Sequence, residues 1–183
     1  MKNTIIIILI SLFGLSLNAQ ENKTKRELRA EKKQKATVKR DSLRLVQEEW
    51  AEKQTFVLEA QQVYNKMGEM FSLTSSINFV YINGEKAIIQ LGFNGIVGWN
   101  GVGGITIKGR ISKYTVEKDN KNIPIYISLT IQGSEGFNDI KIWISTSGRG
   151  EAQVMDNRGN RIKFIGDIVS LEDTRVYIGT ERF

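Results

Sequence analysis

The amino-acid sequence predicts a mainly β protein: an antiparallel β-sandwich or barrel-like domain of seven to eight strands, preceded by an N-terminal charged α-helix. Of the 17 glycines, 16 follow residue 55, where short runs of alternating apolar residues recur between polar turns. No helical pattern of about 10–15 residues separates these runs, which disfavours a parallel α/β fold. Residues 20–55 contain neither Gly nor Pro and are rich in helix-forming Glu, Lys, Arg, Gln and Ala. The chain therefore divides into residues 1–19, 20–55 and 56–183.

Residues 1–19 have the features of a cleaved secretory signal peptide. Lys2 precedes an apolar run from Ile5 to Leu17, and Ala19 is a small residue suited to signal peptidase. The run is shorter than the roughly 20 residues of a membrane-spanning helix. The chain has no cysteine that could carry a lipid anchor. We expect a periplasmic or secreted protein with no transmembrane segment after cleavage; the alternative is an uncleaved N-terminal anchor.

Residues 20–55 are expected to form the charged helix. Opposite charges recur at i, i+4, as in Glu31 with Lys35 and Glu49 with Lys53. From Leu43 onward the apolar residues follow a 3-4 spacing, so the turns from Leu43 to Trp50 should dock on the domain. Most of the formal net charge of +6 lies in this segment. It is either a solvated spacer or a surface for anionic headgroups, and the near-neutral domain gives no reason to expect nucleic acid.

The β domain begins with an ambiguous segment, because residues 56–60 fit either a strand or a continuation of the helix. Ile77–Ile82 and Lys86–Phe93 predict a β-hairpin, since the Asn83-Gly84 turn accepts positive φ. Alternation shifts by one residue near Ser112 or Lys113, which predicts a β-bulge. Residues 133–138 are expected to separate two strands. The other predicted strands cover residues 105–116, 123–131, 140–144, 152–155, 162–169 and, as a short last one, 176–178.

The sequence contains no cysteine and no histidine. Their absence excludes disulfides, thiol catalysis, Ser-His-Asp chemistry and iron–sulfur clusters, together with most zinc, copper and non-haem iron sites. Carboxylates, hydroxyls, Lys and Arg are the groups left for an enzyme. We expect no cofactor, no metal and no catalytic residue.

Two regions supply ligand-binding candidates. The glycine-rich segment 95–104 is either a wide connection between strands or a binding rim that presents Trp99 and Asn100. It lacks the following helix and the GK[ST] ending of a phosphate-binding loop. Glu59 lies inside an apolar segment, where it either pairs with Arg110 or remains an unpaired acid with a raised pKa. The candidates are thus Trp99, Glu59, Asn100 and Arg110.

Five stretches resemble the domain of unknown function 4251 family: Phe56–Ala60, Asn78-Phe79-Val80, the Asn83-Gly84 turn, Gly101–Thr106 and Gly109–Tyr114. The resemblance extends over about residues 56–183. Members of that family are exported proteins of Gram-negative bacteria, many with a signal peptide or a lipid anchor. The resemblance implies export and one compact domain, and it implies no activity and no site residues.

Together these features predict a non-enzymatic binding or structural module of the bacterial cell envelope. Its partner would be an envelope protein or an apolar small molecule. Two alternatives remain open. One is a carrier that holds an apolar ligand within the β fold, because closed sheets of about eight strands can enclose a small ligand. The other is a hydrolase that uses a pair of carboxylates.

Overall fold

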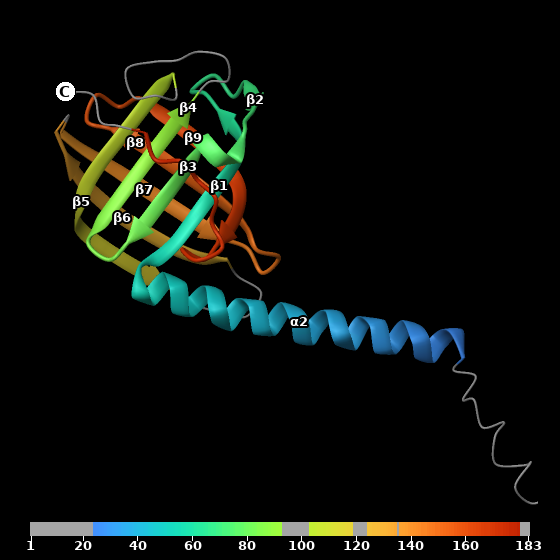
Figure 1. Cartoon of the computed structure of the whole chain (residues 1–183). Coiled ribbons are helices and arrows are strands. Elements are labelled where there is room, and N and C mark those ends of the chain that lie inside the picture. Colours follow the sequence, from blue (N-terminus) through green and yellow to red (C-terminus); the bar gives the residue numbers. More distant parts are fainter. Residues whose placement is uncertain (1–23, 93–102, 119–123, 135, 180–183) are drawn as a thin grey trace, which may run out of the picture. The chain divides into compact units, whose positions relative to one another are not determined.

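The structure is a computed structural model that describes residues 24–92, 103–118, 124–134 and 136–179 (Figure 1). The chain forms two compact units, Met1–Val38 and Lys39–Phe183. The boundary falls within helix α2 (Lys25–Lys53). The second unit therefore contains the last turns of α2 together with the described strands. Within the described residues, no helix combines the length and the apolar character that crossing a bilayer requires.

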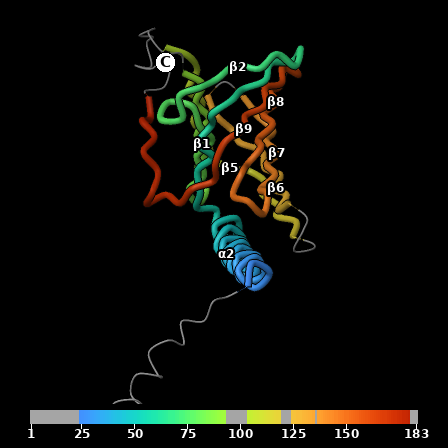
Figure 2. The backbone as a smooth tube through the Cα atoms, turned by 90° about the vertical axis from the view of Figure 1, so that its right-hand side faces the viewer, coloured from blue at the N-terminus to red at the C-terminus, as the bar shows by residue number. Residues whose placement is uncertain are grey.

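Eight antiparallel strands close into a barrel, which Figures 1 and 2 show from two sides. Each strand pairs with the next in the order β1-β3-β4-β5-β6-β7-β8-β9, and the pairing of β1 with β9 closes the circle. A ninth strand, β2 (Met70–Ser72), pairs with the end of β1 outside this circle. The barrel strands are β1 (Thr55–Tyr64), β3 (Phe79–Asn83), β4 (Lys86–Gly92), β5 (Gly104–Glu117), β6 (Ile125–Gly133), β7 (Gly136–Ile144), β8 (Arg149–Asp156) and β9 (Arg161–Val169).

Alternate residues of each strand point into the barrel and form one apolar core. Cross-strand partners lie on the same face, so the pairing of Leu58 with Val80, and of Val80 with Ile89, directs all three inward. Strand β6 contributes Ile125, Ile127, Leu129 and Ile131, each at most 1% exposed. Burial of these aliphatic side chains stabilises the barrel by roughly 1.5–3 kcal/mol per residue.

The last turns of α2 close the end of the barrel at which β1 begins. Ala51 is fully buried in the core, and Trp50 packs against it. The hydroxyl of Tyr114, on β5, donates a hydrogen bond of 2.6 Å to the Ala51 carbonyl oxygen. Burial raises the pKa of Tyr114, which therefore stays a neutral donor. The helix ends at Lys53, and Gln54, with a φ of 56°, turns the chain into β1.

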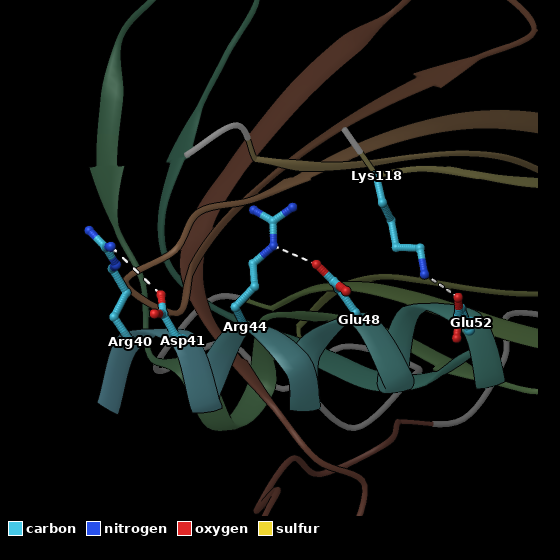
Figure 3. Close-up of polar contacts among 6 residues, drawn as sticks. All are labelled: Arg40, Asp41, Arg44, Glu48, Glu52 and Lys118. Carbon is cyan, nitrogen blue, oxygen red and sulfur yellow. Dashed lines mark hydrogen bonds and ion pairs between the residues drawn. The ribbon is translucent and has the colours of Figure 1, made fainter. Parts of the chain in front are cut away.

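Charged side chains along these last turns form ion pairs on the side of the helix that points toward the barrel strands (Figure 3). Arg44 is 5% exposed, and its Nε lies 2.7 Å from the Glu48 carboxylate. Further along the helix, Glu52 pairs with Lys118, which lies just after β5. This second ion pair joins the helix to the barrel wall. Exposed pairs of this kind contribute about 0–1 kcal/mol, so apolar packing dominates the docking.

Residues 170–179 follow β9 and run across the outer face of β1, β3 and β4. The backbone N–H of Tyr177 donates to the Ser76 carbonyl oxygen at 2.7 Å. Gln90, on β4, donates to the Tyr177 carbonyl oxygen at 2.8 Å and accepts from the Gly179 N–H at 2.8 Å. This segment explains why Phe79 is fully buried although it points out of the barrel.

The structure confirms the mainly β fold with its preceding helix, and it resolves the choice between sandwich and barrel in favour of the barrel. Residues 56–60 belong to strand β1. The bulge is confirmed, because the register of β5 against β6 shifts at Ser112. The hairpin of β3 and β4 is also confirmed, although Asn83 pairs with Lys86, so Gly84 and Glu85 form the turn.

Two sequence predictions differ from the structure, and one strand was not predicted. Strand β7 already begins at Gly136, because its pairing with β6 continues to the Gly133–Gly136 pair. Residues 176–178 do not form a strand, since their backbone and that of Gly179 bond to loop and side-chain groups instead. Strand β2 was not predicted, because three residues are too few for alternation to be recognised.

Candidate ligand-binding site

A cavity of about 310 Å³ opens at the end of the barrel opposite the last turns of α2. It lies where β4 and β8 end and where β5, β7 and β9 begin. Five strands and one turn supply its walls, and most of the lining is aliphatic. The lining residues are Ile89, Leu91, Ile105, Ile107, Asn138, Val154, Asp156, Asn160 and Ile162.

The sheet register explains why these side chains meet. Ile89 pairs with Ile107 and Leu91 with Ile105, so two rungs of the β4–β5 ladder form one wall. On the facing side, Val154 is paired with Ile162 across β8 and β9. Each of these side chains occupies an inward position of its strand. The cavity is therefore the part of the barrel interior at the end opposite the last turns of α2.

One side of the cavity is polar. Asn138, on β7, is paired with Asp156, on β8, and both occupy inward positions. Asn138 is only 4% exposed as a residue, and no hydrogen bond joins its side-chain amide to another described residue. Its amide atoms still reach the cavity, because among the described residues the fully buried side-chain atoms without a partner are those of Gln47. Buried amides in proteins are nearly always hydrogen-bonded, because leaving one unpaired costs about 1–3 kcal/mol. Asn138 is therefore a donor and acceptor available to a molecule inside the cavity.

Asp156 has a different environment, because its own turn surrounds its carboxylate with donors. Oδ1 accepts from the backbone N–H groups of Arg158 at 2.9 Å and Asn160 at 2.8 Å, and Oδ2 accepts from Asn160 Nδ2 at 2.8 Å. The side-chain hydrogen bond from Asn160, followed by these backbone bonds, lowers the pKa of Asp156. Asp156 is thus an anion at neutral pH.

The predicted candidates do not gather at this cavity. Glu59 points outward from β1 and accepts hydrogen bonds from Thr174 Oγ1 at 2.8 Å and from the Arg175 N–H at 3.3 Å. It fastens the segment 170–179 to the barrel. Arg110 is exposed on β5, which β3 and β4 separate from β1, so the suggested pairing of these two residues does not form. Trp99 and Asn100 lie outside the described residues.

Sequence reasoning did not single out Asn138. A signal was nevertheless present, because Asn138 has the same parity as Ile140, Ile142 and Ile144. Its inward position was hidden by the expected long connection after β6, which would have placed Asn138 in a loop.

The arrangement suits binding better than acid–base chemistry. Asp156 is the one carboxylate among the lining residues of the cavity. A more open hollow beside Trp50 contains Glu172 and Asp173, but Asp173 Oδ2 accepts from the Ser170 hydroxyl at 2.7 Å within their own turn. Within the described residues, no group of three or more acidic side chains could hold a metal ion.

Comparisons with known proteins agree on one family. The model of a family described as a domain of unknown function, DUF4251, matches residues 46–168. A crystal structure of a DUF4251 family protein from Bacteroides eggerthii DSM 20697 is similar, with 30% sequence identity and a TM-score of 0.56. The similarity covers 67% of this chain and 84% of that chain. No match was found among curated proteins.

Proposed function

The chain belongs to the DUF4251 family, and we propose that it is a non-enzymatic binding module of the bacterial cell envelope whose barrel takes up a small apolar ligand. The cavity carries this proposal. Its volume of about 310 Å³ lies at the lower end of the range for ligand pockets, about 300–1,000 Å³. Its aliphatic walls would gain about 25 cal/mol for each Å² of apolar surface that a ligand covers.

Location in the envelope is the second part of the proposal. It is supported by the sequence of residues 1–19, with Lys2, the apolar run and Ala19. Cell fractionation and mass spectrometry of the N-terminus test it. We expect a soluble envelope or secreted protein that begins at Gln20. A cytoplasmic protein that begins at Met1 would contradict it.

Ligand uptake can be tested by filling the cavity. Val154 lines the cavity and is 4% exposed, so Val154→Phe should occupy part of the space. Val46→Phe makes the same substitution at a side chain of α2 that is 40% exposed. Octan-1-ol, titrated into ¹⁵N-labelled protein, should shift the amide signals of β4, β5 and β8 in the wild type and in Val46→Phe. Shifts that persist unchanged in Val154→Phe would place binding elsewhere and contradict the proposal.

A hydrolase is the less favoured alternative. Glycoside hydrolysis needs two carboxyl groups facing each other across about 5–10 Å, one of them able to donate a proton. The cavity lining offers Asp156 alone, and its pKa is lowered, whereas a proton donor needs a raised pKa. The chemistry at the cavity therefore supports binding.

A further inference from the structure

We propose that the ligand is a short neutral amphiphile: an apolar chain that ends in a primary amide or a hydroxyl, with a fatty-acid anion excluded. This inference rests on the proposed uptake of an apolar ligand and names its chemical class. It combines three features of the cavity: the unpaired amide of Asn138, the charge of Asp156 and the limited volume.

The amide of Asn138 favours a polar group on the ligand. Its side chain can donate two hydrogen bonds and accept two, and none of the described residues uses them. A pure hydrocarbon would seal the amide away from water without a partner. A ligand that carries both a donor and an acceptor, such as a primary amide or a hydroxyl, could form hydrogen bonds with both the oxygen and the NH₂ group of Asn138.

The charge of Asp156 determines which polar group is accepted. Asp156 is paired with Asn138 in the β7–β8 ladder, so a headgroup bound to Asn138 would lie beside an anion. Arg158, in the turn between β8 and β9, acts on this charge and contributes to the lowered pKa of Asp156. The cations of the neighbouring strands do not face it. Lys141, Arg161 and Lys163 occupy outward positions, and Lys163 lies 3.6 Å from the Glu151 carboxylate. A carboxylate headgroup bound to Asn138 would meet the like charge of Asp156, which is partly exposed, and this repulsion is unfavourable.

The cavity volume determines how much of the chain can be enclosed. At about 30 Å³ for each group of the size of a water molecule, 310 Å³ accommodates on the order of ten non-hydrogen atoms. Octanamide and octanoate each have about that number, and they share the same chain and nearly the same shape. They differ in charge and in the presence of a donor, so they form a matched pair of probes.

The experiment measures the affinity of both probes for the mature chain by calorimetry or by NMR titration at neutral pH. Octanamide should bind at least about tenfold more tightly than octanoate. Asn138→Ala should lower the affinity for octanamide by about three- to tenfold, because one or two hydrogen bonds are lost. Asn83→Ala serves as the control, since Asn83 is exposed at the other end of the barrel and should leave the affinity unchanged.

Asp156→Asn provides an independent variant, because an asparagine can still accept the two backbone hydrogen bonds of the turn. The affinity ratio of octanamide to octanoate should fall towards one in this variant. Equal affinities in the wild type, or tighter binding of octanoate, would overturn the inference and leave the proposed function standing. If neither probe, nor octan-1-ol, perturbs the cavity residues, the proposed function itself fails.

Discussion

Gln47 has a buried side-chain amide that destabilises the fold. It lies in the last turns of α2, is fully buried, and neither its Nε2 nor its Oε1 has a hydrogen-bond partner. An amide buried without partners costs about 1–3 kcal/mol. Methionine has a similar length and no amide, so Gln47→Met should raise the free energy of unfolding by about 1 kcal/mol or more. Urea denaturation measures this change.

Gln34→Met is a suitable control for this experiment, because Gln34 is exposed on the same helix and should change stability little. A loss of stability in Gln47→Met would contradict the prediction. It would show that the amide of Gln47 is satisfied by a buried water molecule, which typically makes about three hydrogen bonds.

Asp156 links the stability of the β8–β9 turn to pH. Its folded-state pKa is lowered from 3.8, chiefly by the side-chain hydrogen bond from Asn160. The unfolded chain therefore binds a proton more readily than the folded one. The stability contributed by the carboxylate is complete above its ordinary pKa and is lost as the pH falls through the lowered value. Urea midpoints should decline in this acidic range for the wild type and less steeply for Asp156→Asn, and equal declines would contradict this.

At the residue scale, the chemistry of Glu59 was visible in the sequence but its direction was not. An acid within an apolar strand indicates a partner, and Glu59 has Thr174 and Arg175. The partners follow it by more than a hundred residues, and alternation alone cannot say which side of a strand will be covered. For Asn138 the opposite was true. The sequence showed that it alternates in step with the inward residues of β7, but it did not show that β7 begins early enough to include it.

At the scale of elements, the junction of α2 and β1 contains a strained residue. Gln54 has a φ of 56°, and its carbonyl oxygen accepts a hydrogen bond from the Gly84 N–H at 2.9 Å. A side chain in this left-handed region costs about 1–2 kcal/mol, whereas glycine adopts it freely at a smaller entropic cost. Gln54→Gly should therefore raise the thermal midpoint, with a gain of up to about 1 kcal/mol.

Gln54→Ala separates backbone strain from loss of the side chain. It keeps the Cβ atom in the left-handed conformation and should bring no gain. If alanine stabilises the protein as much as glycine does, the glutamine side chain and not the backbone is the source of the cost.

The elements that the sequence predicted well are those with a strong local signal. The alternation of Ile125 to Ile131, the charged helix and the shift near Ser112 each arise from side-chain spacing alone. Elements that depend on distant partners were missed. Strand β2 exists because it extends the hairpin of β1, and residues 176–178 are held by Ser76 and Gln90 instead of a sheet. Local alternation carries no information about either arrangement.

At the scale of the whole molecule, the two ends of the barrel differ. The end at which β1 begins is closed by the last turns of α2, with Ala51 in the core and Tyr114 bonded to its carbonyl oxygen. The other end contains the cavity. The pairing of β1 with β9 is what distinguishes this barrel from a sandwich. It joins the first and last barrel strands, and no spacing in the sequence predicts such a contact.

This difference predicts the outcome of two N-terminal truncations. The compact unit begins at Lys39, so a chain that starts there should keep its unfolding midpoint and its affinity for octan-1-ol. A chain that starts at Gln54 loses Trp50 and Ala51 and exposes the core at that end. Its free energy of unfolding should fall by about 3–5 kcal/mol, as for the removal of a large buried side chain. Chemical denaturation of both chains measures the difference, and equal midpoints would mean that the barrel does not need α2 to close it.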